Sequence, residues 1–172
     1  TVFRDQQFSG DMRSHAVKRI DDVLMLRARQ FREDAGPLAH PVRPEDYIEI
    51  NNFYTATVYE KGAEVIGMLK TLVGDEGYAK ALDLYFDRHD GQACTIEHWI
   101  KVFEDACETD LSQFKLWYSQ AGTPNVSVKE HFADGTYTLD LSQTTKPTPG
   151  QDQKLPVVIP LRVAAFDADG AQ

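Results

Sequence analysis

The sequence predicts a mainly α-helical chain that ends in a few antiparallel β-strands. Two observations lead to this prediction. Apolar residues recur every three to four positions from residue 11 to residue 117, which is the period of an amphipathic helix. After Pro124 the period becomes two, which is typical of half-buried strands. We therefore expect a helical unit at residues 1–122 and the first strands of a second, truncated unit at residues 123–172.

Size and composition are those expected of a globular protein without nucleic-acid or membrane partners. The 172 residues suffice for one domain, or one domain and part of another, and 42% of them are apolar. A net charge of −9 repels a phosphate backbone, and no apolar run approaches the length of a membrane span. Two cysteines, Cys94 and Cys107, fit reduced thiols better than a disulfide framework. We therefore expect a cytoplasmic protein.

Residues 11–35 are predicted to form the first long helix. Their apolar positions make a broad stripe, and arginine, aspartate and glutamine occupy the rest. Gly36-Pro37 ends the helix, and Pro41 and Pro44 favour extended backbone in the residues before them. The stripe consists of Val17, Ile20, Val23, Leu24, Leu26 and Phe31.

A second helix is predicted to begin at a capping box. In this arrangement the Thr57 hydroxyl accepts from the Glu60 amide, and the Glu60 carboxylate accepts from the Thr57 amide. Apolar positions between residues 58 and 73 share one face. Gly74 is predicted to end this helix.

Three further helices are predicted before residue 122. One is opened by Asp75, the next is capped by Thr95, and the last is capped by Asp110 together with Gln113. The predicted breakers are Asp90-Gly91 after the first of these helices and Gly122-Thr123-Pro124 after the last.

Three strands are predicted in the remainder. Residues 126–131 and 137–141 alternate apolar and polar positions, and Ala133-Asp134-Gly135 between them is a hairpin signal. Residues 157–166 are predicted to form the third strand, and residues 167–170 a turn after it.

Both ends of the sequence indicate a piece of a longer polypeptide. Thr1 stands where a methionine would begin a chain, and apolar residues follow it with no capping residue before them. At the other end a predicted turn leads to no further strand, which would leave a terminal strand unpaired. We therefore expect neighbouring segments on both sides.

No complete catalytic motif occurs in the sequence. It has no H-E-x-x-H, no G-x-S-x-G, no phosphate-binding loop and no C-x-x-C. Cys94 and His98 are four residues apart, but a thiol near an imidazole is favoured over a metal site. We therefore expect no metal ion on this chain.

One local pattern does point to chemistry. Tyr54 and Tyr59 flank the helix start predicted at Thr57, so both hydroxyl groups could approach one pocket there. A helix N-terminus carries free amides and a positive partial charge, which suits developing negative charge. On the residues alone, the favoured interpretation of Tyr59 is a residue at the edge of the core.

The same stretch resembles the zinc aminopeptidase family, and within it the bacterial aminopeptidase N branch. The motif Tyr-Glu-Lys-Gly-Ala stands at residues 59–63, and further matching segments follow in the order of that family. Together they cover essentially the whole chain. The segments are residues 1–8, 40–42, 50–53, 58–63, 68–69, 74, 85–91 and 117–124.

This resemblance implies a fold and a cofactor. Residues 1–122 would be the helical C-terminal half of a thermolysin-like catalytic domain, and residue 123 would begin a β-sandwich domain. Zinc in the parent protein would be held by two histidines of an H-E-x-x-H helix and a downstream glutamate, as in gluzincins. In the family these ligands, and the motif that binds the substrate amine, precede the residue matching Thr1. We therefore expect zinc in the parent protein, and an inactive chain when the upstream half of the catalytic domain is missing.

The resemblance also assigns roles to five residues. Tyr59 matches the family's catalytic tyrosine, whose phenol donates a hydrogen bond to the tetrahedral oxyanion. A phenol suits this role because it stays protonated at neutral pH. Tyr54 and Asp5 match residues that line the pocket for the first side chain of the substrate. Asn51 and Glu60 match positions near the leaving group.

Two functions follow for the parent protein. The first is an exopeptidase that hydrolyses N-terminal residues from peptide substrates, with Tyr59 supplied by this chain. The second is a non-catalytic helical interaction module on the same scaffold. The sequence encoded upstream of Thr1 separates them, because an H-E-x-x-H followed by a glutamate supports only the enzyme.

Overall fold

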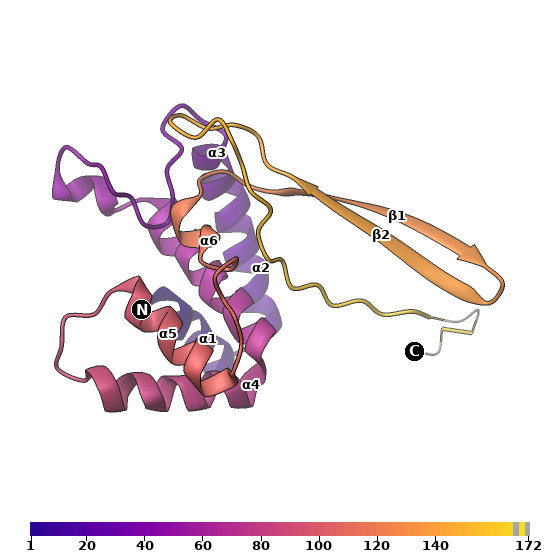
Figure 1. The fold of residues 1–172 in the computed structure, drawn as a ribbon, viewed down its shortest axis with the longest axis horizontal. Helices are drawn as coiled ribbons and strands as arrows, with labels where there is room; N and C mark the ends of the chain where they lie inside the picture. Colours follow the sequence, from indigo (N-terminus) through magenta and orange to yellow (C-terminus); the bar gives the residue numbers. More distant parts are fainter. Residues whose placement is uncertain (167–168, 171–172) are drawn as a thin grey trace.

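The computed structural model describes residues 1–166 and 169–170, and it confirms the predicted order of helices followed by antiparallel strands. A β-hairpin extends away from a helical body (Figure 1). The helices are α1 (Val2–Met12), α2 (His15–Met25), the π-helix η1 (Leu26–Gln30), α3 (Phe31–Asp34), the 3₁₀ helix η2 (Ile50–Phe53), the π-helix η3 (Thr57–Lys61), α4 (Gly62–His89), α5 (Ile96–Cys107) and α6 (Leu116–Ser119). The strands are β1 (Asn125–Ala133) and β2 (Thr136–Thr144).

The core lies between α4 and α5. Val65 and Leu69 of α4 pack in one cluster with Ile100 and Phe103 of α5, and none of the four is more than 1% exposed. All four stand at predicted apolar positions, so the periodicity of these helices is confirmed. Each such burial contributes about 1.5–3 kcal/mol, and the cluster fixes the two helices against each other.

The first predicted helix appears as α2, η1 and α3, and a separate helix, α1, precedes it. Ser14 separates α1 from α2, and its Oγ caps α2 by accepting from the backbone N–H of Val17 at 3.4 Å. The predicted start at residue 11 is therefore wrong, because a serine in extended conformation is a preferred N-cap. The predicted end is confirmed, since α3 stops at Asp34 just before the Gly-Pro pair.

The apolar stripe of α2 is exposed rather than buried. Val17, Ile20 and Leu24 are 60%, 60% and 62% exposed, and no residue of α2 is buried. The amphipathic pattern is present, but nothing among the described residues covers it. A contiguous apolar surface of this kind marks a place where another part of a protein packs.

Gly74 divides α4 as predicted. Its φ of 76° and ψ of 170° are non-helical and belong to a region that essentially only glycine adopts. The helix ends at His89, and Gly91 follows with a φ of 72°, so the predicted break at Asp90-Gly91 is also confirmed. No helix that the structure describes, α4 included, is both long and apolar enough to cross a membrane.

The two later helices differ in how well they were predicted. Thr95 caps α5 as expected: its Oγ1 accepts from His98 N–H at 3.4 Å, and His98 Nδ1 accepts from Thr95 N–H at 3.2 Å. The helix predicted after Asp110 is shorter. Asp110 Oδ1 accepts from Ser112 N–H at 2.9 Å and caps a turn, and only Leu116–Ser119 is helical.

The hairpin turn is the predicted one. Ala133 pairs with Thr136, which leaves a two-residue loop of Asp134 and Gly135 with φ values of 51° and 75°. Positive φ at both positions is the signature of a type I′ turn, whose twist matches that of the strands.

Residues 157–166 do not form the predicted third strand. Among the described residues they pair with no other strand. The Gln143 side chain holds Val157 instead, with Nε2 donating to its carbonyl at 2.8 Å and Oε1 accepting from its N–H at 3.0 Å. Trp117 Nε1 donates to the Val158 carbonyl at 2.7 Å. The prediction is wrong, and side chains take the place of a strand partner for the backbone of Val157 and Val158. The turn predicted at residues 167–170 lies partly outside the described residues.

Candidate functional site

The two tyrosines singled out by the sequence lie side by side. Tyr54 follows η2 and Tyr59 lies in η3, and their rings stack with centroids 6.0 Å apart and planes inclined by 23°. Tyr54 is 69% exposed and Tyr59 is 41% exposed, so neither ring belongs to the buried core. Neither hydroxyl has a hydrogen-bond partner in the described part of the chain. Both remain available to a ligand.

Thr57, two residues before Tyr59, is anchored to the segment at the end of α3. Its side chain is fully buried, and its N–H and Oγ1 both donate to Oε2 of Glu33, at 2.7 and 2.6 Å. Gln30, which is 1% exposed, donates from Nε2 to Thr57 Oγ1 at 3.3 Å. These contacts tie the π-helix η3 to the π-helix η1 and to the last turn of α3.

Lys61, two residues after Tyr59, is anchored to the same region. Its Nζ donates to Asp34 Oδ2 at 2.8 Å and to the Gly122 carbonyl at 2.9 Å. Thr123 Oγ1 donates to the same Asp34 oxygen at 2.8 Å. Burial alone raises the pKa of Asp34, but the charge of Lys61 and the donated hydrogen bonds outweigh it, so the pKa lies below its usual value.

Together the two anchors determine where Tyr59 points. Thr57 and Lys61 are four residues apart in one π-helical turn, and both face inward. Tyr59 is midway between them and therefore faces outward. Isolated π-helical turns occur frequently at functional sites, because they re-aim one side chain without ending the helix. The structure thus presents the Tyr59 phenol from a firmly held backbone.

The capping box predicted at Thr57 and Glu60 is wrong. The residue before the helix is Ala56, and the Oγ1 of Thr55 accepts from Val58 N–H at 3.1 Å. Because Glu33 takes the Thr57 amide, Glu60 is not needed as a cap. The Tyr59 amide donates to the Thr55 carbonyl at 3.1 Å, so the free amides expected at this helix start are already paired.

Glu60 and Asp5 meet at a different hollow. They line a cavity of about 270 Å³ between α1, α2 and the start of α4. Neither tyrosine lines it, so Asp5 and Glu60 lie at a different hollow from the stacked pair Tyr54 and Tyr59. Half of the lining residues are acidic: Val2, Asp5, Gln6, Lys18, Asp21, Asp22, Met25, Leu26, Glu60 and Glu64.

Asn51 contributes through its backbone. It is exposed in η2, and its carbonyl accepts from Tyr54 N–H at 3.2 Å. This contact closes the 3₁₀ turn that places Tyr54 next to Tyr59. The roles assigned to Tyr59, Tyr54, Asp5, Asn51 and Glu60 by the resemblance stay predictions.

The anchoring residues were not identified from the sequence, although one signal was available. Glu33 and Asp34 stand at the C-terminal end of a helical run, where acidic side chains interact unfavourably with the helix dipole. Such placement indicates that a partner elsewhere stabilises them. Here the partners are Thr57 and Lys61, which lie on either side of the predicted catalytic tyrosine.

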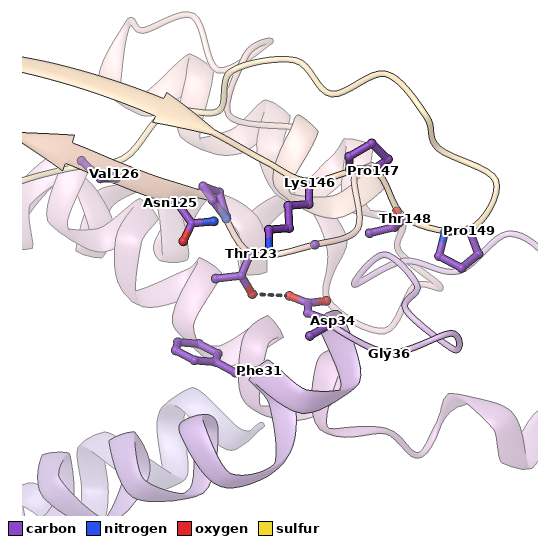
Figure 2. A pocket seen from close by; sticks show the side chains of 13 residues that line it. Phe31, Asp34, Gly36, Thr123, Asn125, Val126, Lys146, Pro147, Thr148 and Pro149 are labelled. Atoms are coloured by element: carbon purple, nitrogen blue, oxygen red, sulfur yellow. Dashed lines mark hydrogen bonds between the residues drawn. The ribbon is translucent and has the colours of Figure 1, made fainter.

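A further cavity lies where the helical body meets the hairpin. It has a volume of about 560 Å³, and Figure 2 shows Asp34 and Thr123 joined by a hydrogen bond at its wall. None of the predicted site residues lines it. Asp34 is the one acidic residue that lines this cavity, and it is already paired with Lys61. The cavity therefore offers no free carboxylate for catalysis.

Comparison with known protein families gives two matches. Residues 1–118 match the model of the peptidase family M1 domain. Residues 122–172 match a domain of unknown function with an Ig-like fold.

Two proteins similar to this chain are both named aminopeptidase N. Aminopeptidase N of Escherichia coli (strain K12) is 54% identical over 172 residues, which is 99% of this chain and 20% of that protein. Aminopeptidase N of Caulobacter vibrioides is 62% identical over 129 residues, or 75% of this chain and 15% of that protein. The chain thus spans about one fifth or less of the length of these relatives.

A solved structure shows the same fold. Legionella pneumophila aminopeptidase A in complex with aspartic acid matches 84% of this chain with a TM-score of 0.70, over 16% of its own length. At 24% identity this likeness concerns the fold alone.

Proposed function

Because this chain belongs to peptidase family M1, we propose that its parent protein is a zinc-dependent aminopeptidase and that Tyr59 acts in the active site. The observation that supports this role is the outward-facing phenol, held between the buried anchors Thr57 and Lys61. A hydroxyl group that has no hydrogen-bond partner among the described residues, on so constrained a backbone, is suited to bind something from outside.

The chemistry of Tyr59 in this proposal is hydrogen-bond donation. Attack on a peptide carbonyl places negative charge on its oxygen, and a fixed phenol O–H stabilises that charge in the transition state. The stacked ring of Tyr54 limits the directions in which the Tyr59 ring turns. This preorganisation lowers the cost of aligning the donor at the moment of reaction.

We propose that the parent protein binds the catalytic zinc, and that the residues around Tyr59 do not hold it by themselves. Around Tyr59 the described residues include no cluster of histidine, cysteine and acidic side chains suited to hold a metal ion. We therefore assign the zinc ligands to another part of the polypeptide, and we expect this chain to have no peptidase activity without that part.

The exposed stripe of α2 is where we place the missing part. Val17, Ile20 and Leu24 present an uncovered apolar surface, and a neighbouring hollow of about 750 Å³ is lined by Phe8 and Met12 among other residues. Burying this face would stabilise the complete protein by removing apolar area from water. The division between the catalytic part and the following β domain is placed at residues 122–123.

The proposed partners and location follow from charge and thiols. Peptide substrates are proposed for the parent protein, and the net charge of −9 disfavours nucleic acid. No membrane partner is proposed. Both cysteines are free thiols, in keeping with the proposed cytoplasmic location.

The test uses the full-length parent protein. It should release residues from peptides with a free amino terminus and not from the same peptides with an acetylated terminus, and chelation should abolish the activity until zinc is restored. The sequence upstream of Thr1 should contain H-E-x-x-H followed by a glutamate. Absence of that motif together with absence of hydrolysis would favour the non-catalytic interaction module.

A further inference from the structure

Three metal-binding side chains meet at the junction of α4 and α5, at the opposite end of α4 from Tyr59. His89 is the last residue of α4, Cys94 lies in the turn that follows, and His98 lies in the first turn of α5. One ligand atom from each lies within 4.8 Å of the other two. The sequence drew attention only to Cys94 and His98. The fold adds His89 by turning the chain back at Asp90 and Gly91.

The groups in this triad have few other partners. Nδ1 of His89 is buried and has no hydrogen-bond partner among the residues that the structure describes. Cys94 is a free thiol whose Sγ makes long contacts, 3.8 Å to the His89 carbonyl and 3.7 Å to the Gln92 carbonyl, and it also interacts with the Tyr85 side chain. The rings of His89 and His98 stack with centroids 4.8 Å apart. A buried nitrogen without a partner costs free energy, and a metal ion bound at Nδ1 of His89 would remove that cost.

We propose that His89, Cys94 and His98 form a binding site for one thiophilic divalent cation, of which Zn²⁺ is the best match. One thiolate and two imidazoles are ligands that zinc accepts, and calcium and magnesium prefer oxygen. With three protein ligands, a water molecule completes a tetrahedral arrangement. This site is separate from the zinc proposed for catalysis, and it does not depend on that proposal.

The side chains have to move slightly to bind the ion. Zinc bonds of about 2.0 Å to nitrogen and 2.3 Å to sulfur place tetrahedral ligand atoms about 3.3–3.5 Å apart. The three atoms must therefore close by roughly 1 Å from their separation of up to 4.8 Å. Side-chain rotation supplies this, because Cys94 lies in a turn and His98 is exposed.

Binding must also displace one hydrogen bond. His98 Nδ1 accepts from Thr95 N–H in the capping box of α5. A neutral imidazole has one lone pair, so His98 cannot accept at Nδ1 and bind a metal through Nε2 together. Whether His98 binds the metal through Nδ1 or through Nε2, the hydrogen bond from Thr95 N–H to His98 Nδ1 is lost. The other half, from His98 N–H to Thr95 Oγ1, is unaffected.

Co²⁺ titration of the full-length protein under reducing conditions tests the proposal. Co²⁺ substitutes for Zn²⁺, and a thiolate ligand gives a charge-transfer absorption that histidine and carboxylate ligands do not give. The wild-type protein should show this absorption and should bind one more equivalent of Co²⁺ or Zn²⁺ than Cys94→Ser does. Cys107→Ser, which removes the other thiol of this chain, should bind like the wild type.

His98→Gln separates ligation from helix capping. A glutamine at this position can still accept from the Thr95 amide, so α5 keeps its cap while the site loses a ligand. The affinity for the extra equivalent should fall by about 100-fold or more, since even outer-shell changes cost 10–100-fold. Equal metal binding and equal absorption in the wild type, Cys94→Ser and His98→Gln would overturn the proposal. Loss of the absorption in Cys107→Ser would also overturn it.

Discussion

Nζ of Lys61 lies 2.8 Å from Oδ2 of Asp34, in an ion pair whose side chains are 7% and 1% exposed. This pair joins the π-helix that carries Tyr59 to the end of α3. It also reaches the start of the β region through Gly122 and Thr123. The same two side chains therefore secure the candidate site and the junction between the helices and the hairpin.

Removal of one partner should destabilise the chain strongly. Lys61→Met leaves a buried carboxylate uncompensated, so urea unfolding should show a loss of about 3–5 kcal/mol. The double change Lys61→Met with Asp34→Leu should recover most of that loss. Lys70→Met is the matched control: its side chain is 30% exposed and pairs with Asp75, which is 89% exposed, so the change should cost at most about 1 kcal/mol. A similar cost for both lysines would contradict the role given to Lys61.

The same pair predicts a dependence of stability on pH. In the folded chain the pKa of Asp34 lies below its ordinary value of 3.8. Ionised Asp34 therefore stabilises the folded state above pH 3.8, and this stabilisation is lost as the pH falls through the folded pKa. Between pH 7 and pH 3 the wild type should lose more unfolding free energy than the Lys61→Met, Asp34→Leu variant.

The comparison with the double variant isolates Asp34 from other carboxylates. Glu97, whose pKa a hydrogen bond from Arg43 lowers to about 2, is present in both proteins and its effect cancels. Equal losses of unfolding free energy in the two proteins would show that Asp34 does not contribute to the pH dependence of stability.

Tyr59→Phe tests the proposed oxyanion role in the full-length enzyme. Removing one preorganised donor should lower kcat by about 10²–10³ and leave KM nearly unchanged, because the hydrogen bond forms mainly in the transition state. Tyr54→Phe keeps the stacked ring and should have a smaller effect. Steady-state kinetics on one peptide substrate compares them, and unaltered turnover in Tyr59→Phe would remove that residue from the mechanism.

Thr57→Val tests whether the buried anchor positions Tyr59. Valine keeps the volume of the side chain but loses the hydroxyl contacts to Glu33 and Gln30. The free energy of unfolding should therefore fall by about 1–3 kcal/mol. In the full-length enzyme kcat should fall by about 10- to 100-fold through misplacement of the phenol. Thr57→Ser keeps the hydroxyl and should retain most of the stability and most of kcat. A stability loss with unchanged kcat would limit Thr57 to a structural role.

Gly74→Ala tests the bend in α4. Alanine at a φ of 76° and ψ of 170° is strained by about 1–3 kcal/mol, and no described atom lies within 4 Å of the added Cβ, so a steric clash does not contribute. Gly67→Ala is the matched control. Its Cβ would meet Phe3 at an ordinary contact distance of 3.4 Å, and a helical alanine should be neutral or stabilising by up to about 1 kcal/mol. Thermal unfolding of both variants gives the comparison.

Features decided by neighbouring residues were predicted well from the sequence. Gly74, Thr95 and the Asp134-Gly135 turn each do what the local pattern indicates. Backbone preferences and capping act over a few residues, so the pattern contains the information needed.

Features decided by distant contacts were not predicted. Thr57 looks like a helix cap in sequence, but Glu33, 24 residues earlier, takes its amide and turns it into a buried anchor. Residues 157–166 look like a strand, but Gln143 and Trp117 satisfy part of that backbone. In both cases tertiary hydrogen bonds compete with the local pattern. The same applies to His89, which the chain reversal brings to Cys94.

The hairpin has a consequence for handling the isolated chain. No residue of β1 is buried, and among the described residues each strand pairs only with the other. The outer rims of this ribbon therefore offer rows of unpaired amides and carbonyls that resemble the growing end of a larger sheet. Separate molecules can add to one another along these rims, so concentrated samples of the chain should self-associate through main-chain pairing, independently of the apolar surface on α2.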